Sequence, residues 1–251
     1  MPRDSRSSSS SYSPRQGRYS QQTLRPIYNL LFVLPLLAFF HFGAAWYGTS
    51  LYAVRDLGRL LDYFGATGLY LPGLLIVAAL VAQHVARPGR GRLKLTVLGG
   101  MAGESIVCAA PLAAMNLLTG MILTAAADGA TPGQPLLREL LRDTGAGLYE
   151  EFIFRLAFIS LAVLVFVDVF ELRKDVVVIL AIVVSAVLFS LYHFPPHQFS
   201  QGLSFPWKEF LFRAAAGLYL GGLYVVRGFG ITVGAHITYN VYAFLSSAVP
   251  G

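Results

Sequence analysis

Residues 145–158 read GAGLYEEFIFRLAF. Glu150, Glu151 and Arg155 lie in this stretch, and the fifteen residues that follow Arg155 are apolar at all but two positions. An ionisable side chain at membrane depth costs roughly 3 kcal/mol, so such residues usually serve a function. The stretch therefore predicts a membrane helix that carries a functional site at one end.

The composition extends this interpretation to the whole chain. Apolar residues make up 55% of the 251 residues, charged residues 13%, and the mean hydropathy is +0.60. So few charges cannot solvate the surface of a soluble protein, which predicts an all-α, polytopic transmembrane helix bundle. The net charge of +6 bears on topology and on contact with the lipid bilayer, and nothing in the sequence indicates a nucleic-acid partner. The single cysteine, Cys108, excludes an internal disulfide.

Seven apolar stretches are long enough for a helix to cross a hydrocarbon core of about 30 Å. The third is too long for one straight span and contains Pro111, which predicts a broken or tilted helix and would supply an eighth span if it folded back. In the sixth, Gly217 and Gly221 form a GxxxG motif that predicts close helix packing. The seven stretches are 27–47, 69–86, 95–127, 148–170, 176–194, 210–226 and 229–249.

The distribution of basic residues predicts the orientation. The positive-inside rule places the N-terminus and the basic loop 87–94 on the cytoplasmic side of the cell inner (plasma) membrane. Seven spans then put Glu150 and His193 at one level on the outer side, whereas eight spans turn them toward the cytoplasm. A reporter fused after Gly251 distinguishes the two topologies.

Composition also divides the chain along its length. Residues 1–25, rich in Ser, Arg, Gln and Tyr, are predicted to be a disordered basic tail, and residues 26–127 hold the N-terminal transmembrane helices. Residues 128–147 combine Gly, Pro, Thr and mixed charge, which is typical of a linker, with a short amphipathic piece at 136–141. Residues 148–251 hold the remaining spans, which are denser in polar and ionisable groups.

Three of the last four spans carry polar residues at helical spacing. Glu151 and Arg155 are four residues apart in the favourable order, so we expect them to pair. Glu150 lies about 100° round the helix from Glu151 and points elsewhere. The next clusters pair Phe189 with His193, and His236 with Asn240, each four residues apart.

A carboxylate, two imidazoles and a carboxamide, gathered in one bundle, are sufficient for hydrolysis. Glu150 in a low-dielectric site can act as a general base on water, with a histidine beside it to share the proton and orient the water. A second histidine and Asn240 can donate hydrogen bonds to the oxyanion of a tetrahedral intermediate. This scheme needs no serine or cysteine nucleophile.

These motifs resemble those of a known family. Glu150-Glu151-x-x-x-Arg155, Phe189-x-x-x-His193 and His236-x-x-x-Asn240, in this order on successive apolar segments, are similar to the CPBP family. That family includes the type II CAAX prenyl proteases and the bacterial Abi or bacteriocin-immunity relatives. The resemblance covers residues 137–249.

The resemblance implies an intramembrane glutamic-type endopeptidase that needs no metal or other cofactor. Its substrate would be a membrane-associated protein or peptide, cut near the C-terminus or within a membrane-associated segment. Prenylated CAAX proteins, peptide pheromones, bacteriocins and C-terminal sorting tails all remain open as substrates. The family pattern would make Glu150 and His193 activate water, His236 and Asn240 stabilise the oxyanion, Glu151 and Arg155 fix the first helix, and Phe189 shape the site.

Two other functions remain open from the residues alone. His193, His236 and Glu150 are ligand types that would suit a zinc-dependent membrane protease, although the sequence has no HExxH segment. A non-enzymatic bacteriocin-immunity protein or a proton-coupled carrier could use the same ionisable groups. Comparing Glu150→Ala with the wild type separates that class from the proteases. A non-enzymatic protein would cleave no peptide even as the wild type, and Glu150 would be dispensable for its phenotype.

The remaining ionisable residues have structural interpretations. We expect Glu104 to be an interfacial or intrahelically bonded carboxylate and Arg213 to be an interfacial cation. We expect the other histidines, His41, His84 and His197, to be hydrogen-bonded packing residues.

Overall fold

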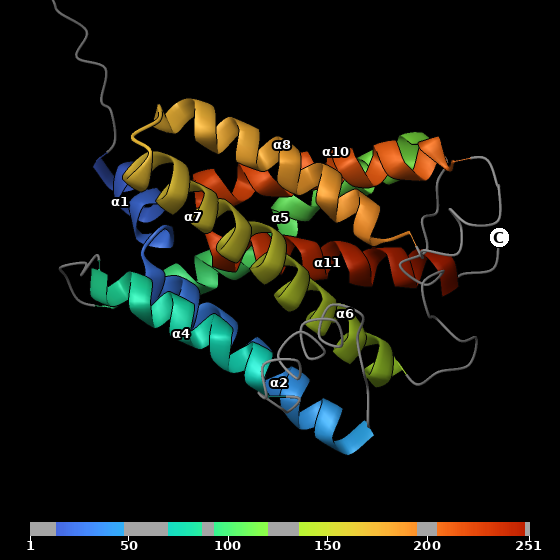
Figure 1. The fold of residues 1–251 in the computed structure, drawn as a ribbon. Coiled ribbons are helices and arrows are strands. Elements are labelled where there is room, and N and C mark those ends of the chain that lie inside the picture. Colours follow the sequence, from blue (N-terminus) through green and yellow to red (C-terminus); the bar gives the residue numbers. More distant parts are fainter. Residues whose placement is uncertain (1–13, 48–69, 87–92, 120–135, 195–204, 249–251) are drawn as a thin grey trace, which may run out of the picture.

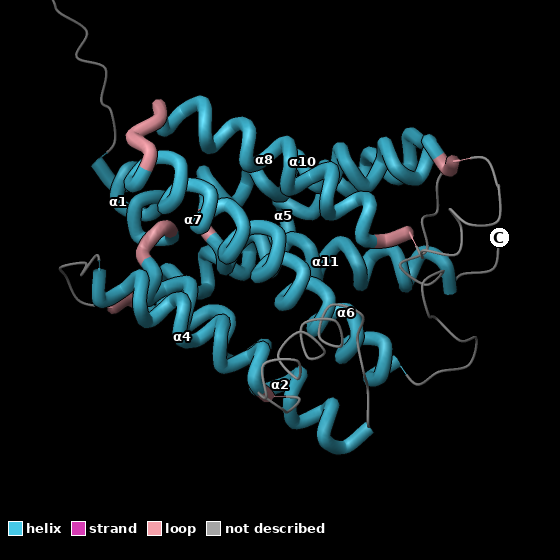
Figure 2. Tube along the Cα trace, in the orientation of Figure 1, coloured by secondary structure: helices cyan, strands magenta, loops and turns pink. Residues whose placement is uncertain are grey.

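The computed structural model describes residues 14–47, 70–86, 93–119, 136–194 and 205–248, and all of the regular structure in these ranges is helical (Figures 1 and 2). The prediction of an all-α fold is confirmed. In chain order the elements are α1 (Pro14–Thr23), α2 (Pro26–Tyr47), α4 (Leu71–Ala86), α5 (Leu95–Thr119), α6 (Leu136–Glu151), the π-helix η1 (Phe152–Ala157), α7 (Phe158–Val163), the π-helix η2 (Leu164–Val169), α8 (Lys174–Tyr192), α10 (Trp207–Arg227) and α11 (Phe229–Ala248).

Several of these helices can cross a membrane. Among the described residues, five helical segments are long and apolar enough to do so: α2, α5, the continuous helix from α6 through η2, α8 and α10. The predicted second span, α4, is a shorter apolar helix, and the predicted last span forms α11. Side chains such as Leu118 (88% exposed) and Leu95 (83% exposed) face outward from the bundle. The chain is therefore a multi-pass helical membrane protein.

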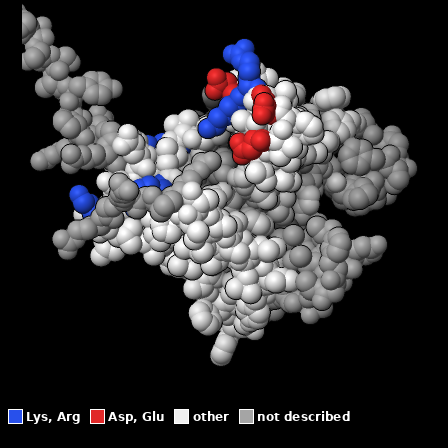
Figure 3. All heavy atoms as spheres, turned by 60° about the vertical axis from the view of Figure 1, so that its left-hand side comes forward, with Lys and Arg blue, Asp and Glu red and all other residues white. Residues whose placement is uncertain are grey.

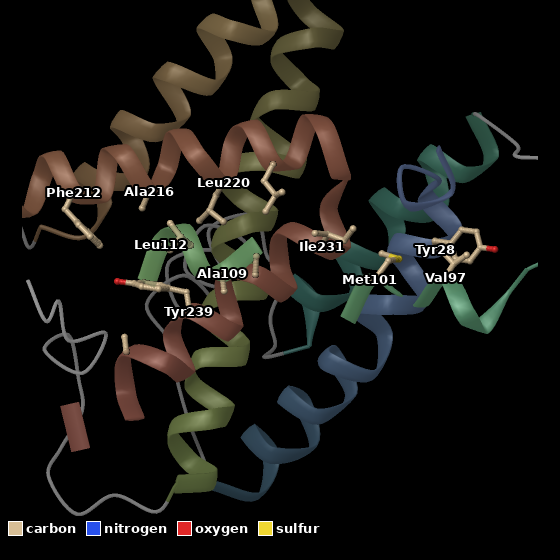
Figure 4. Close-up of a cluster of buried hydrophobic side chains, with 13 residues drawn as sticks. Tyr28, Val97, Met101, Ala109, Leu112, Phe212, Ala216, Leu220, Ile231 and Tyr239 are labelled. Carbon is tan, nitrogen blue, oxygen red and sulfur yellow. The ribbon is translucent and has the colours of Figure 1, made fainter. Parts of the chain in front are cut away.

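The overlong third stretch forms a single helix over its described part. Helix α5 runs from Leu95 to Thr119 and continues through Pro111, so the expected break is absent there. The helix is supported along its length because Met101 and Leu112 pack with Ile231 of α11 in one buried cluster (Figure 4). This tertiary packing compensates for the loss of the backbone hydrogen bond that the proline cannot make. Residues 120–127 of the predicted stretch lie outside the described residues.

The N-terminal tail differs from its prediction. Residues 14–23, assigned from composition to a disordered tail, form helix α1, while residues 1–13 lie outside the described residues. Tyr19 of α1 donates a hydrogen bond to Glu104 of α5 (2.8 Å). Burial, together with this hydrogen bond, raises the pKa of Tyr19 to about 12, so the hydroxyl remains a donor at physiological pH. Composition did not predict this helix, because a contact with the distant helix α5 holds it in place.

Glu104 also binds Arg227 at the end of α10. The Nε and Nη2 atoms of Arg227 lie 2.5 and 2.6 Å from the two oxygens of Glu104, which is a bidentate ion pair. The carboxylate therefore joins three helices, α1, α5 and α10. Its partners come from other helices, so of the two alternatives expected for Glu104 the intrahelical bond is wrong, and the interfacial position stays a prediction.

The predicted linker is helical in its second half. Residues 136–147 belong to α6, which continues without interruption through Glu151 into η1. The segment is polar on one side, yet Leu141 and Leu148 are buried, with exposures of 1% and 0%. Residues 120–135 lie outside the described residues, and the division of the chain into domains stays a prediction.

The GxxxG motif brings α10 close to α8. A Cβ atom on Gly217 would lie 2.9 Å from the Cα of Ala186, and one on Gly221 would lie 2.9 Å from a methyl group of Ile182. These distances leave no room for a side chain at either glycine. The prediction of close packing is confirmed.

Charged side chains gather at the ends of the helices. The turn between η2 and α8 contains Glu171, which has a positive φ of 54°, followed by Arg173 and Lys174. In Figure 3, acidic and basic side chains form a compact group at one edge, and most of the remaining described surface in that view is uncharged. This distribution suits helices whose sides face lipid.

Candidate active site

Three helices bring the predicted site residues to one region of the bundle. The continuous helix α6–η1 packs against α11, and η1 also packs against α8. The candidate residues are Glu150 and Glu151 at the end of α6, Arg155 in η1, Phe189 and His193 at the end of α8, and His236 and Asn240 in α11.

Glu150 lies opposite two histidines. Its Oε2 atom is 3.8 Å from Nε2 of His193 and 3.8 Å from Nε2 of His236, while the residue itself is only 8% exposed. These separations exceed a normal hydrogen bond, but contacts of this kind are often long before substrate binds and tighten afterwards. The carboxylate and the two imidazole nitrogens therefore converge on one point.

Glu151 connects His236 to Arg155. Its Oε1 atom is 2.7 Å from Nδ1 of His236 and 3.0 Å from Nη1 of Arg155, and both Glu151 and Arg155 are 0% exposed. The ion pair predicted from the four-residue spacing is present. Because Nδ1 of His236 is bound to Glu151, the opposite nitrogen of the ring, Nε2, is the one that faces Glu150.

Phe189 and Gly217 surround the guanidinium of Arg155. Arg155 lies over the ring of Phe189, 4.5 Å from its centroid, and its Nη2 donates to the carbonyl of Gly217 at 3.3 Å. The Phe189 ring also makes edge contacts with His193 and His236, with centroid distances of 4.8 and 6.0 Å. The ring thus contacts the guanidinium and both imidazoles, and the guanidinium also reaches the main chain of α10.

His193 is oriented by its own helix. It caps the C-terminus of α8, and its Nδ1 lies 2.8 Å from the Phe189 carbonyl, which can only accept a hydrogen bond. Nδ1 therefore carries the proton, so Nε2 is the atom that faces Glu150. Both histidines present Nε2 to the same carboxylate.

Asn240 is the predicted residue that stands somewhat apart. It is 7% exposed and lies one helical turn beyond His236 on α11. Within the described ranges it makes no hydrogen bond to the other candidate side chains. The structure thus places it beside the site without a direct link to Glu150.

Two acidic residues near the site were missed from the sequence. Glu139 and Asp143 are 4% and 2% exposed, and Arg142 lies 2.6 Å from Glu139 and 3.9 Å from Asp143. Asp143 precedes Glu150 by seven residues, which places both on one face of the helix. That spacing could have been recognised in the sequence, but residues 128–147 were assigned to a linker and so were not considered as part of a helix.

The other histidines and Arg213 fit their structural interpretations in part. His41 of α2 is hydrogen-bonded through Nε2 to the Tyr149 hydroxyl (2.9 Å), as expected for a packing residue. The buried Nδ1 atom of His84 has no hydrogen-bond partner among the residues that the structure describes, and His197 lies outside them. Arg213 lies over the ring of Phe194, 5.2 Å from its centroid.

The zinc alternative requires a group of metal ligands, which the described part of the chain does not contain. No group of three or more His, Cys, Asp or Glu side chains there is placed to hold a metal ion. The Glu151 contact also occupies Nδ1 of His236, leaving Nε2 as the nitrogen of that ring for any ligand.

Comparison with known protein families agrees with the resemblance read from the motifs. Residues 134–242 match the family described as type II CAAX prenyl endopeptidase Rce1-like. Searches of curated proteins and of solved structures give no significant match. The matched residues contain α6, α8, α10 and most of α11, and therefore every candidate side chain from Glu150 to Asn240. This segment, which contains the whole candidate site, is therefore similar to the type II CAAX prenyl endopeptidases of the Rce1-like family.

Proposed function

We propose that the protein is an intramembrane endopeptidase that hydrolyses a peptide bond with water activated by Glu150. The observation that carries this proposal is the convergence of His193 Nε2 and His236 Nε2 on one oxygen of Glu150, each at 3.8 Å. A buried carboxylate flanked by two imidazoles is suited to proton transfer, and the family match supports peptide hydrolysis as the reaction.

In the first step, Glu150 removes a proton from a water molecule held between Glu150 and His193. The water oxygen forms a bond to the scissile carbonyl carbon, and the carbonyl oxygen becomes an oxyanion. Glu150 then donates the proton to the leaving nitrogen as the C–N bond breaks. The products are a free carboxylate and a free amine.

The oxyanion is stabilised by His236 and Asn240. His236 is fixed by Glu151, so its Nε2 is directed at the reacting atoms, and it donates there when both ring nitrogens carry protons. The Asn240 side chain lies one turn further along the same helix and supplies a second N–H donor. Arg155 holds Glu151 in place through the buried ion pair.

The substrate in this proposal is a membrane-associated protein or peptide, cut near its C-terminus or within a membrane-associated segment. The family description names CAAX prenyl substrates, and the surroundings of Glu150 are helices whose outer faces are apolar. We place the protein in the cell inner (plasma) membrane, where the lipid bilayer brings such substrates to the helix bundle.

The test compares peptide cleavage by purified wild-type protein, Glu150→Gln and His193→Ala. We expect both variants to lose cleavage while they remain folded in membranes, because each removes a group that handles the proton of the attacking water. Comparing the membrane proteomes of wild-type and Glu150→Ala cells identifies the substrate. Full activity of Glu150→Gln would end the glutamate-base mechanism.

A further inference from the structure

The π-helical turn η1 sets the geometry of the candidate site. Glu150 and Glu151 end α6, and η1 begins at the next residue and contains Arg155. A π turn holds one more residue between its hydrogen-bonded ends than an α turn, so it changes the angle between Glu151 and Arg155. The π turn therefore sets the direction from which Arg155 approaches Glu151, the Phe189 ring and the Gly217 carbonyl.

The same turn deprives one main-chain carbonyl of its usual donor. In an α-helix, the N–H of Phe158 would bond to the carbonyl of Phe154, four residues earlier. Here the N–H of Phe158 bonds instead to the carbonyls of Ile153 and Arg155. A buried carbonyl that loses its donor is unfavourable unless another donor replaces it.

Ser185 supplies the replacement from a different helix. Its hydroxyl, on α8, donates to the Phe154 carbonyl at 2.5 Å, and the residue is 1% exposed. The donor is thus aimed at the carbonyl that the π turn has freed. Without it, the chain would favour the return of the Phe158 N–H to Phe154, which is the α-helical arrangement.

We propose that Ser185 is a positioning residue of the peptidase: its hydroxyl keeps η1 π-helical and so keeps Arg155 aligned with Glu151. Glu151 in turn holds His236 (2.7 Å), which faces Glu150. The structural part of this inference stands on the contacts alone, and its kinetic part rests on the proposed function.

Helix α8 also provides a matched control. Ser190 is 0% exposed, and its hydroxyl likewise donates to a main-chain carbonyl of another helix, that of Phe210 in α10, at 2.8 Å. Ser185→Ala and Ser190→Ala therefore remove the same hydroxyl from the same helix at equal burial. They differ in that the Ser185 bond ends on the π turn and the Ser190 bond does not.

The experiment uses the full-length protein in detergent micelles with a cleavable peptide. We expect Ser185→Ala to lower kcat about tenfold at unchanged KM, Ser190→Ala to stay within about twofold of the wild type, and Ser185→Thr, which keeps the hydroxyl, to restore turnover. Hydrogen–deuterium exchange of residues 152–158 should change in Ser185→Ala and remain as in the wild type in Ser190→Ala.

Equal turnover of the two alanine variants, or unchanged exchange over residues 152–158 in Ser185→Ala, would overturn the role of Ser185. If the wild type cleaved no peptide, the proposed function would fail, and the exchange pattern would still decide whether Ser185 holds the turn.

Discussion

Replacing Arg155 with methionine tests whether the buried ion pair supports the fold. The guanidinium is 0% exposed, lies 3.0 Å from Glu151 and donates to the Gly217 carbonyl. Removing one partner of a buried pair costs about 3–5 kcal/mol, because the charge of Glu151 then keeps only the hydrogen bond from His236. At about 1.4 kcal/mol per factor of ten, we expect the unfolding equilibrium of Arg155→Met to shift by roughly a thousandfold.

The double variant Glu151→Gln with Arg155→Met isolates the charge effect. It removes both charges and retains a side-chain oxygen that can accept from Nδ1 of His236, so we expect it to be more stable than Arg155→Met by about 2 kcal/mol. The measurement is reversible unfolding in mixed micelles with increasing denaturing detergent. An Arg155→Met variant within about 1 kcal/mol of the wild type, or a double variant no more stable than the single one, would refute the reasoning.

Three further predictions test the site and its packing. Asn240→Ala should retain folded protein and lower turnover about 100- to 1000-fold in the peptide assay, as expected for one lost oxyanion donor; wild-type turnover would remove Asn240 from the mechanism. Gly217→Ala should lower the free energy of unfolding by about 1–3 kcal/mol because its Cβ would overlap α8, whereas Gly222→Ala, with open space around it, should not; equal stabilities would contradict the packing. Purified protein should keep its peptidase activity in excess chelator, and a loss that zinc restores would favour the zinc alternative.

Local spacing in the sequence predicted part of the site correctly. The four-residue interval predicted that Glu151 lies beside Arg155, and the two side chains are 3.0 Å apart, although the turn between them is π-helical rather than α-helical. The motif order on successive spans predicted that His193 and His236 would meet Glu150, and both lie 3.8 Å from it. The catalytic roles of these residues remain proposals.

Contacts between distant segments were beyond the sequence. The bond from His236 to Glu151 spans 85 residues, and the pair of Arg227 with Glu104 spans 123. No sequence pattern predicts either contact, because only the tertiary packing of the helices brings these residues together. The π turn that contains Arg155 was equally hidden, since its apolar residues suit an α-helix as well.

The core around Tyr149 limits which substitutions this protein can accept during evolution. Tyr149 shares a buried cluster with Phe40 of α2 and Ile76 of α4, which lie outside the segment that matches the family. A Cβ atom on Gly43 would also overlap the Leu141 side chain. Substitutions in the first helices are therefore constrained by the packing of the Rce1-like segment, and the reverse also holds. A larger residue at position 43 requires the Leu141 side chain to move or to be replaced by a smaller one, so these two positions should covary among relatives.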